Sequence, residues 1–126
     1  LPSRASGMPG GVLLVIDQKG DVLKIDRRAS MIGMHRTSTA VFYTDGRENV
    51  NVTPRGDKIL SRAHWEGASL VMEHKATMTR NGQTVVVESK EIRRLSEGGR
   101  LLIIDDTVRD PDESGPEHFT LVFVRK

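Results

Sequence analysis

Short runs of alternating hydrophobic and polar residues fill most of the chain, and turn-forming residues separate them. From residue 12 onward the runs recur about every ten residues, a spacing typical of antiparallel sandwiches and barrels. The alternation predicts strands over residues 12–17, 21–28, 37–44, 47–53, 57–65, 68–80, 83–95, 100–108 and 118–125.

Two of these runs also carry apolar side chains at helical spacing, so periodicity alone does not assign them. Pairing residues 68–80 with 83–95 around Asn81-Gly82 favours strands, because Asn-Gly promotes the tight turn of a hairpin. The pairing also places opposite charges across from one another on one face, Lys75 opposite Glu88 and Glu73 opposite Lys90. A hairpin is therefore predicted, and a pair of helices is the alternative.

The period-two rule, carried through each turn, gives every strand one face toward a shared interior. The predicted inward side chains are Val41, Tyr43, Val50, Val52, Ile59, Ser61, Ala63, Trp65, Leu70, Met72, His74, Ala76, Met78, Val85, Val87, Ser89, Glu91, Arg93, Leu102, Ile104, Asp106 and Val108. Sequential hairpins that share one face predict an all-β fold, an antiparallel up-and-down meander barrel of about eight to ten strands. A β-sandwich, or an α+β fold with residues 68–80 and 85–95 helical, is the alternative.

Length and composition fit one domain. The 126 residues, 37% of them apolar, suffice for one hydrophobic core. Residues 12–126 are predicted to form this domain, and residues 1–11, rich in Pro, Gly and Ser, a flexible leader. Removal of an export signal just upstream would give such a start, and so would trimming, which leaves a periplasmic or secreted location as one option among several.

Charge and residue usage exclude several classes of partner. With 19 basic and 17 acidic residues, a net charge of +2 and only 4% aromatic residues, no nucleic-acid partner is predicted. No segment approaches the roughly 20 apolar residues of a membrane span. Cysteine is absent and the four histidines lack ligand spacing, so neither a metal nor a cofactor is predicted.

One part of the predicted interior is polar. His74, Ser89, Glu91, Arg93 and Asp106 fall on three neighbouring strands and point to the same side, with Asp106 opposite either Ser89 or Glu91. Buried charges are costly unless they are paired or hydrated. This set therefore either holds the polar group of a ligand or forms a self-satisfied ion-pair network at the barrel mouth.

The candidate ligand-binding residues are these five together with Trp65, Met72 and Tyr43. His74, Ser89 and Asp106 also have the residue types of a nucleophilic triad. The sequence holds no nucleophile elbow, however, so no catalytic residue is predicted.

Three segments carry turn motifs of a known kind. They are residues 39–48 with Asp45-Gly46, residues 61–71 with Trp65-Glu66-Gly67, and residues 91–101 with Leu95-Ser96-Glu97-Gly98-Gly99. In these motifs the chain resembles small bacterial lipocalin-like proteins of the calycin and fatty-acid-binding kind, over residues 12–126. The resemblance implies a lipocalin-like barrel that binds a small apolar molecule. Most such bacterial proteins have no assigned function, and a minority of the wider superfamily are enzymes.

The leading functional prediction is binding of a small, largely apolar or amphipathic molecule inside the barrel, with its polar end near Arg93 and His74. One alternative is a barrel isomerase or hydrolase that uses His74 with Asp106 or Glu91. A further alternative is a ligand-free interaction or inhibitor module that works through its loops. The ligand and the oligomeric state are left open by the sequence.

Overall fold

Strands account for almost every element of the structure, a computed structural model that describes residues 2–5, 12–31, 34–53 and 56–125. They are β1 (Pro2–Ala5), β2 (Val12–Lys19), β3 (Val22–Met31), β4 (Met34–Tyr43), β5 (Asp45–Val52), β6 (Lys58–Glu66), β7 (Ser69–Arg80), β8 (Gln83–Ser96), β9 (Leu101–Arg109) and β10 (Glu117–Arg125). A single 3₁₀ turn, η1 (Glu97–Gly99), lies between β8 and β9. The predicted all-β class is confirmed, and the helical alternative for residues 68–80 and 85–95 is wrong. The described residues form no helix long and apolar enough to cross a membrane.

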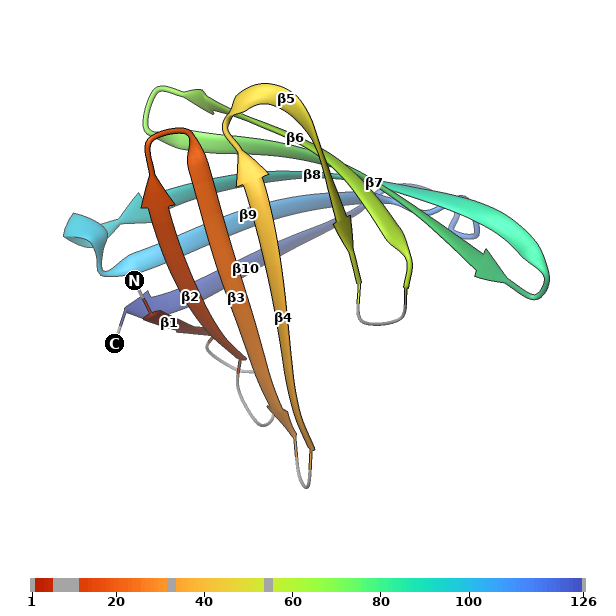
Figure 1. Ribbon diagram of the computed structural model, residues 1–126, viewed down its shortest axis with the longest axis horizontal. Helices are drawn as coiled ribbons and strands as arrows, with labels where there is room; N and C mark the ends of the chain where they lie inside the picture. Colours follow the sequence, from red (N-terminus) through yellow and green to blue (C-terminus); the bar gives the residue numbers. More distant parts are fainter. Residues whose placement is uncertain (1, 6–11, 32–33, 54–55, 126) are drawn as a thin grey trace.

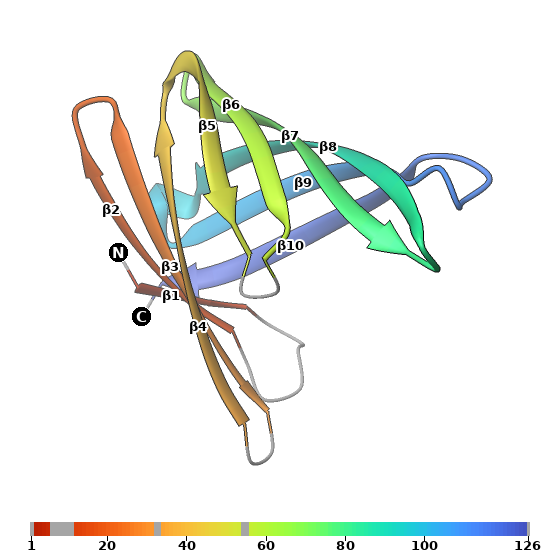
Figure 2. The ribbon, with the colours of Figure 1, turned by 45° about the vertical axis from the view of Figure 1, so that its right-hand side comes forward.

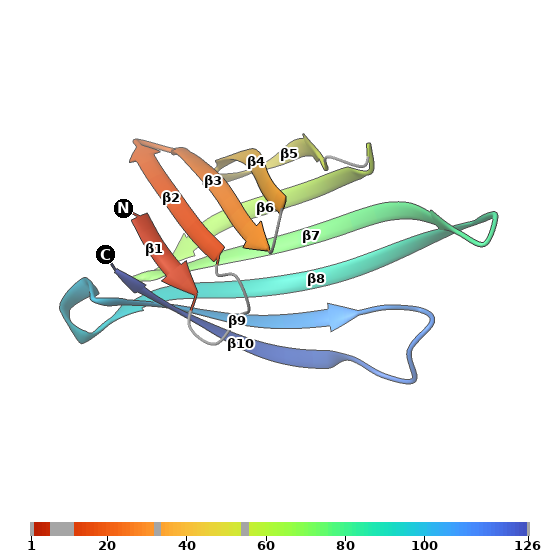
Figure 3. The same cartoon turned by 90° about the horizontal axis from the view of Figure 1, so that it is seen from below.

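The strands form one ten-stranded sheet in the order β4-β3-β2-β1-β10-β9-β8-β7-β6-β5. Figures 1 and 3 show this sheet folded over on itself, so that β2–β4 cross one side of the long strands β6–β10. Apolar side chains from both layers make the core, namely Val12, Leu14, Leu23, Ile25 and Phe42 from the first layer and Ala63, Leu70, Met72, Leu102, Ile104 and Phe123 from the second. Figure 2 shows the far ends of β7–β10 projecting beyond the region where the layers overlap. The predicted meander of sequential antiparallel hairpins is confirmed.

The β7–β8 hairpin has the predicted register. Asn81 and Gly82 both have positive φ, 50° and 77°, as the tight turn between two strands requires. Lys75 therefore pairs with Glu88, and His74 with Ser89. Because the side-chain period in a strand is two, every inward assignment on this hairpin follows from that one turn.

The N-terminal segment contains a short strand that the hydrophobic alternation does not predict. Within residues 1–11, predicted as a flexible leader, Pro2–Ala5 form β1, which pairs with both β2 and β10. Strand pairing uses backbone groups, so a short strand needs no alternation of side chains that a sequence pattern would reveal. Residues 1 and 6–11 lie outside the described part of the chain.

The predicted inward positions of Val50 and Val52 are wrong. The sequence pattern predicts a four-residue loop over 54–57. In the structure Val52 pairs with Lys58, so five residues make the loop. Thr53 closes it, because its backbone N–H donates to the carbonyl of Asp57 over 2.9 Å. One extra residue reverses the faces of the strand. The two valines are consequently 58% and 59% exposed, and Asn49 faces inward instead at 4%.

The predicted inward positions of Val41 and Tyr43 are wrong as well. On β4 the buried side chain is Phe42, at 7% exposure. The prediction treated Asp45-Gly46 as the turn of a hairpin, but in the described residues no backbone ladder joins β4 to β5. Without a ladder, the register of one strand cannot be extended to the next.

Two asparagine side chains bridge β4 and β5 in place of a ladder. The Val41 N–H donates to Oδ1 of Asn51 over 3.1 Å, and Nδ2 of Asn51 donates back to the Val41 carbonyl over 3.1 Å. Asn49 repeats the arrangement at Tyr43, whose N–H donates to its Oδ1 over 2.9 Å. A side-chain amide thus replaces a backbone peptide at both positions. We call this line of contacts the asparagine seam.

Candidate functional site

A polar cluster lies on the inner face of three adjacent strands. The β7–β8 register directs His74, Glu91 and Arg93 inward, and the β8–β9 register places Asp106 directly opposite Glu91. Of the two positions predicted for Asp106, the one opposite Glu91 is therefore correct. The side chains of His74, Glu91 and Arg93 are only 12%, 17% and 16% exposed. We call these four residues the inner cluster.

Glu91 is the centre of the inner cluster. Its Oε2 accepts hydrogen bonds from Nε and Nη2 of Arg93, at 2.9 and 2.7 Å. Its Oε1 lies 3.1 Å from Nε2 of His74, a distance suited to an ion pair, although the angle is poor for a hydrogen bond. Burial alone would raise the pKa of the Glu91 carboxyl. The contact with His74 and the charge of Arg93 outweigh burial and lower this pKa to about 2, so the carboxyl is ionised at neutral pH.

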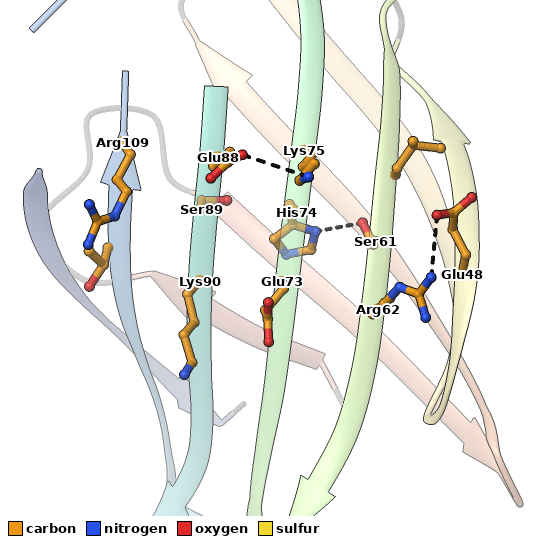
Figure 4. Close-up of a pocket in the computed structure, with 12 residues that line it drawn as sticks. Glu48, Ser61, Arg62, Glu73, His74, Lys75, Glu88, Ser89, Lys90 and Arg109 are labelled. Atoms are coloured by element: carbon orange, nitrogen blue, oxygen red, sulfur yellow. Dashed lines mark hydrogen bonds and ion pairs between the residues drawn. The ribbon is translucent and has the colours of Figure 1, made fainter. Parts of the chain in front are cut away.

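His74 connects Glu91 to two further inward side chains. Its Nδ1 lies 2.6 Å from Oγ of Ser61, which faces it across the β6–β7 ladder. Figure 4 shows this contact between neighbouring strands. When Nδ1 is unprotonated, the serine hydroxyl donates and the ring proton sits on Nε2, facing Glu91. From the opposite layer, the Phe42 ring meets the imidazole edge to face, with centroids 6.0 Å apart. These contacts hold the imidazole in one orientation.

Asp106 has a different environment from Glu91. Burial, followed by the charge of Glu91, raises the pKa of the Asp106 carboxyl. Its Oδ1 is buried and has no hydrogen-bond partner among the described residues. The same holds for Nη1 of Arg93 and, by strict geometry, for Nε2 of His74. Because Nε2 of His74 already faces Glu91, the inner cluster retains one unused donor, Nη1 of Arg93, and one unused acceptor, Oδ1 of Asp106.

Apolar space adjoins the inner cluster on two sides. A cavity of about 400 Å³ has apolar walls from both layers and reaches Arg93, and its lining includes Ile16, Leu23, Ile25, Leu70 and Leu102. Trp65, Arg100 and Arg125 also line it. A smaller cavity of about 210 Å³, lined in part by Leu14, Phe42 and Ile59, shares Ile25 and Arg93 with the first. Arg93 therefore stands between two largely apolar compartments.

The remaining predicted contacts are distributed differently. Trp65 is 44% exposed and lines the larger cavity, whereas Asp106 is not among the residues that line it. Met72 is fully buried in the core and lines neither of these two cavities. Ser89 faces inward opposite His74. Tyr43 faces outward, where the Arg47 guanidinium lies 4.3 Å above its ring, so its predicted place in the site is wrong.

Sequence reasoning missed two members of the site. The Glu66-Gly67 turn predicts that Ser61 faces inward, but the sequence does not assign it to the polar cluster; in the structure Glu66 pairs with Ser69, which brings Ser61 opposite His74. Phe42 was assigned to the outer face by the incorrect register of β4, and no local signal in that strand corrects the error. Its contact with His74 comes from the folding of one layer over the other.

A third hollow, of about 590 Å³, is lined mainly by outward-facing charged residues of β5–β9, and Ser61, His74 and Ser89 also line it (Figure 4). Acidic and basic side chains alternate there and several are paired, as in Arg62–Glu48 at 3.7 Å and Lys75–Glu88 at 3.8 Å. Such a surface lacks the single sign of charge that would select a charged ligand. Among the described residues no group of three or more His, Asp or Glu side chains could hold a metal ion.

The fold is similar to that of solved fatty-acid-binding proteins. The REP1-NXSQ fatty acid transporter aligns with 92% of this chain and 71% of its own, at 16% identity and a TM-score of 0.65. Fatty-acid-binding protein 1 of Echinococcus granulosus aligns with 91% of this chain and 71% of its own, at 20% identity and a TM-score of 0.53. The brain fatty-acid-binding protein of Drosophila melanogaster aligns with 91% of this chain and 73% of its own, at 16% identity and a TM-score of 0.55.

At such identities the likeness shows the fold, an all-β antiparallel meander of the fatty-acid-binding type. No family model matches the chain. No curated protein matches it either.

Proposed function

We propose that this protein binds a small, largely apolar, amphipathic molecule between the two layers of its sheet, with the polar end near Arg93 and His74. One observation carries the proposal. A cavity of about 400 Å³ with apolar walls ends at a buried guanidinium that has one unpartnered nitrogen. Apolar pockets with a few convergent polar groups are the usual form of small-molecule sites, and their volumes are about 300–1,000 Å³.

The fold supports the same class of ligand. The solved proteins that share it carry or bind fatty acids according to their names. A fold alone does not set function, so the proposal depends on the site. The mixed lining suits a molecule with a hydrocarbon body and one polar end. It is largely apolar and carries the buried Arg93 together with Arg94, Arg100 and Arg125.

Blocking the cavity tests the proposal. Leu102→Trp adds bulk to the lining of the larger cavity, so binding of the neutral dye Nile red should weaken at least tenfold. Ile92→Trp, on the outer face of β8, is the matched control and should leave the affinity within twofold. Circular dichroism confirms that both variants fold. Unchanged dye affinity in folded Leu102→Trp would contradict the proposal. Native mass spectrometry of the unmodified chain should, in addition, reveal small amphiphiles that co-purify.

Ester hydrolysis is a second candidate, favoured by the chain of contacts from Ser61 through His74 to Glu91. These residue types and their order match a nucleophile, a base and an orienting acid. Ser61 is 1% exposed, however, which keeps an ester away from its hydroxyl. Turnover of p-nitrophenyl decanoate that disappears in both Ser61→Ala and His74→Ala would support this candidate. Turnover that survives either change would exclude it.

A further inference from the structure

The polar groups left without a partner in the inner cluster define the chemistry of a ligand's polar end. One is a donor, Nη1 of Arg93, and one is an acceptor, Oδ1 of Asp106. Both residues adjoin Glu91, as does His74. Arg93 bonds to it, His74 lies 3.1 Å from it, and Asp106 faces it across the ladder. Arg93 and Asp106 are diagonal neighbours on β8 and β9, about 7–8 Å apart at the backbone, a span that one small group between their side chains can bridge.

The charge balance of the inner cluster disfavours an anion. The two hydrogen bonds from Arg93 to Glu91 pair one positive with one negative charge. Asp106 adds either no charge or one negative charge, depending on its protonation. A ligand carboxylate would therefore bring an uncompensated negative charge into a largely buried site. It would also compete with Glu91 for the guanidinium.

We propose that the polar end of the ligand is a hydroxyl group, so that the protein binds an amphipathic alcohol in preference to the corresponding acid. This inference rests on the proposed function and narrows its ligand class. A hydroxyl has one proton to donate and two lone pairs to accept with. It matches the unpartnered set of one acceptor and one donor and adds no charge. An ionised carboxylate can only accept hydrogen bonds, and it would place an oxygen against Oδ1 of Asp106, which is also an acceptor.

Three probes with one chain length separate the possibilities. They are 1-decanol, decanoate and methyl decanoate, titrated at neutral pH against the fluorescence of Trp65, the single tryptophan, which lines the cavity. We expect 1-decanol to bind at least tenfold more tightly than decanoate. Methyl decanoate, which accepts but cannot donate, should bind with intermediate affinity.

A variant that removes the charge of Asp106 provides an independent test. Asp106→Asn keeps an acceptor oxygen and removes the negative charge, so decanoate should bind at least fivefold more tightly and 1-decanol should change by less than twofold. Asp105→Asn is the control, since Asp105 is the next residue on β9, faces outward and accepts from Thr120 over 2.9 Å. This control should alter neither affinity.

Decanoate affinity equal to or above that of 1-decanol in the unmodified chain would overturn the hydroxyl assignment and leave the proposed binding function standing. Failure of all three probes to bind would count against the binding function itself. If Asp106→Asn does not fold, the ranking of the three probes on the unmodified chain still decides the assignment.

Discussion

The β7–β8 hairpin carries ion pairs on both of its faces, and the two faces differ in burial. On the inner face, Glu91 and Arg93 are 17% and 16% exposed and form hydrogen bonds of 2.7 and 2.9 Å. On the outer face, Lys75 and Glu88 are 64% and 52% exposed and lie 3.8 Å apart. Two pairs of opposite charge on one hairpin, one within β8 and one between β7 and β8, thus occupy opposite environments.

The difference separates two roles for charge. Exposed pairs are screened by water and must restrict two long side chains, so they contribute little to stability. A buried pair loses its hydration, and even good contacts often only offset that loss. Apolar side chains of similar size would be an equally stable choice for the inner face. Retaining charges there is consistent with a binding role for the inner cluster, and the outer pairs keep the sheet surface hydrated.

The largest effect is expected from removing the inner cation. Arg93→Ala leaves the ionised Glu91 buried without its main partner, so the free energy of unfolding should fall by roughly 3–5 kcal/mol. Urea unfolding followed by circular dichroism measures this. The double variant Arg93→Met/Glu91→Gln removes both charges of the pair and should recover most of the loss. If Arg93→Ala left the free energy of unfolding unchanged, the inner pair would not be enclosed.

The inner pair should also make stability depend on pH. The pKa of Glu91 is lowered from 4.5 to about 2, so its stabilising effect is complete above the unfolded value and is lost as pH falls toward 2. The full effect is roughly 3 kcal/mol. Asp106 acts in the opposite direction. Its pKa is raised, so its contribution to the free energy of unfolding declines as the pH rises through that raised pKa. Unfolding measured across the acid range should lose the Glu91 slope in Glu91→Gln but retain it in the outer-face control Glu88→Gln.

The asparagine seam extends the comparison to uncharged groups. Asn49 is 4% exposed, whereas the bonds made by Asn51 lie in exposed surroundings. Asn49→Ala leaves the Tyr43 N–H without its acceptor in a poorly hydrated place, and should cost about 1–3 kcal/mol. Asn51→Ala should cost less, since water can replace the lost amide. Thermal unfolding of the two single variants ranks them, and an equal or reversed order would contradict the assignment of burial along the seam.

The smallest effect is expected on the outer face. Lys75→Ala removes one partner of an exposed pair and should change the free energy of unfolding by less than about 1 kcal/mol. Melting Lys75→Ala beside Arg93→Ala in one buffer provides the most direct contrast of the two faces. If the lysine variant were the more damaging, the hairpin register would be reversed, and the inner cluster with it.

The sequence by itself determined the β7–β8 hairpin and three members of the inner cluster. A two-residue turn at Asn81-Gly82 leaves one favourable pairing, and the strict alternation of side chains then directs His74, Glu91 and Arg93 to one face. Ser61 follows from the next turn by the same rule. These features rest on neighbours in the chain, which is why a pattern of residues contains them.

Tertiary structure determined the features that local sequence rules do not predict. The loop between β5 and β6 has five residues rather than four, a choice made by the Thr53–Asp57 contact and not by any alternation. Because no backbone ladder crosses the asparagine seam, the register of β5 does not determine that of β4. The sequence pattern therefore places Phe42 and Tyr43 on the wrong faces. The short strand β1 and the cavity beside Arg93 depend on where one layer crosses the other. Contacts between residues distant in the chain leave no periodic trace in either segment, and only the folded molecule brings them together.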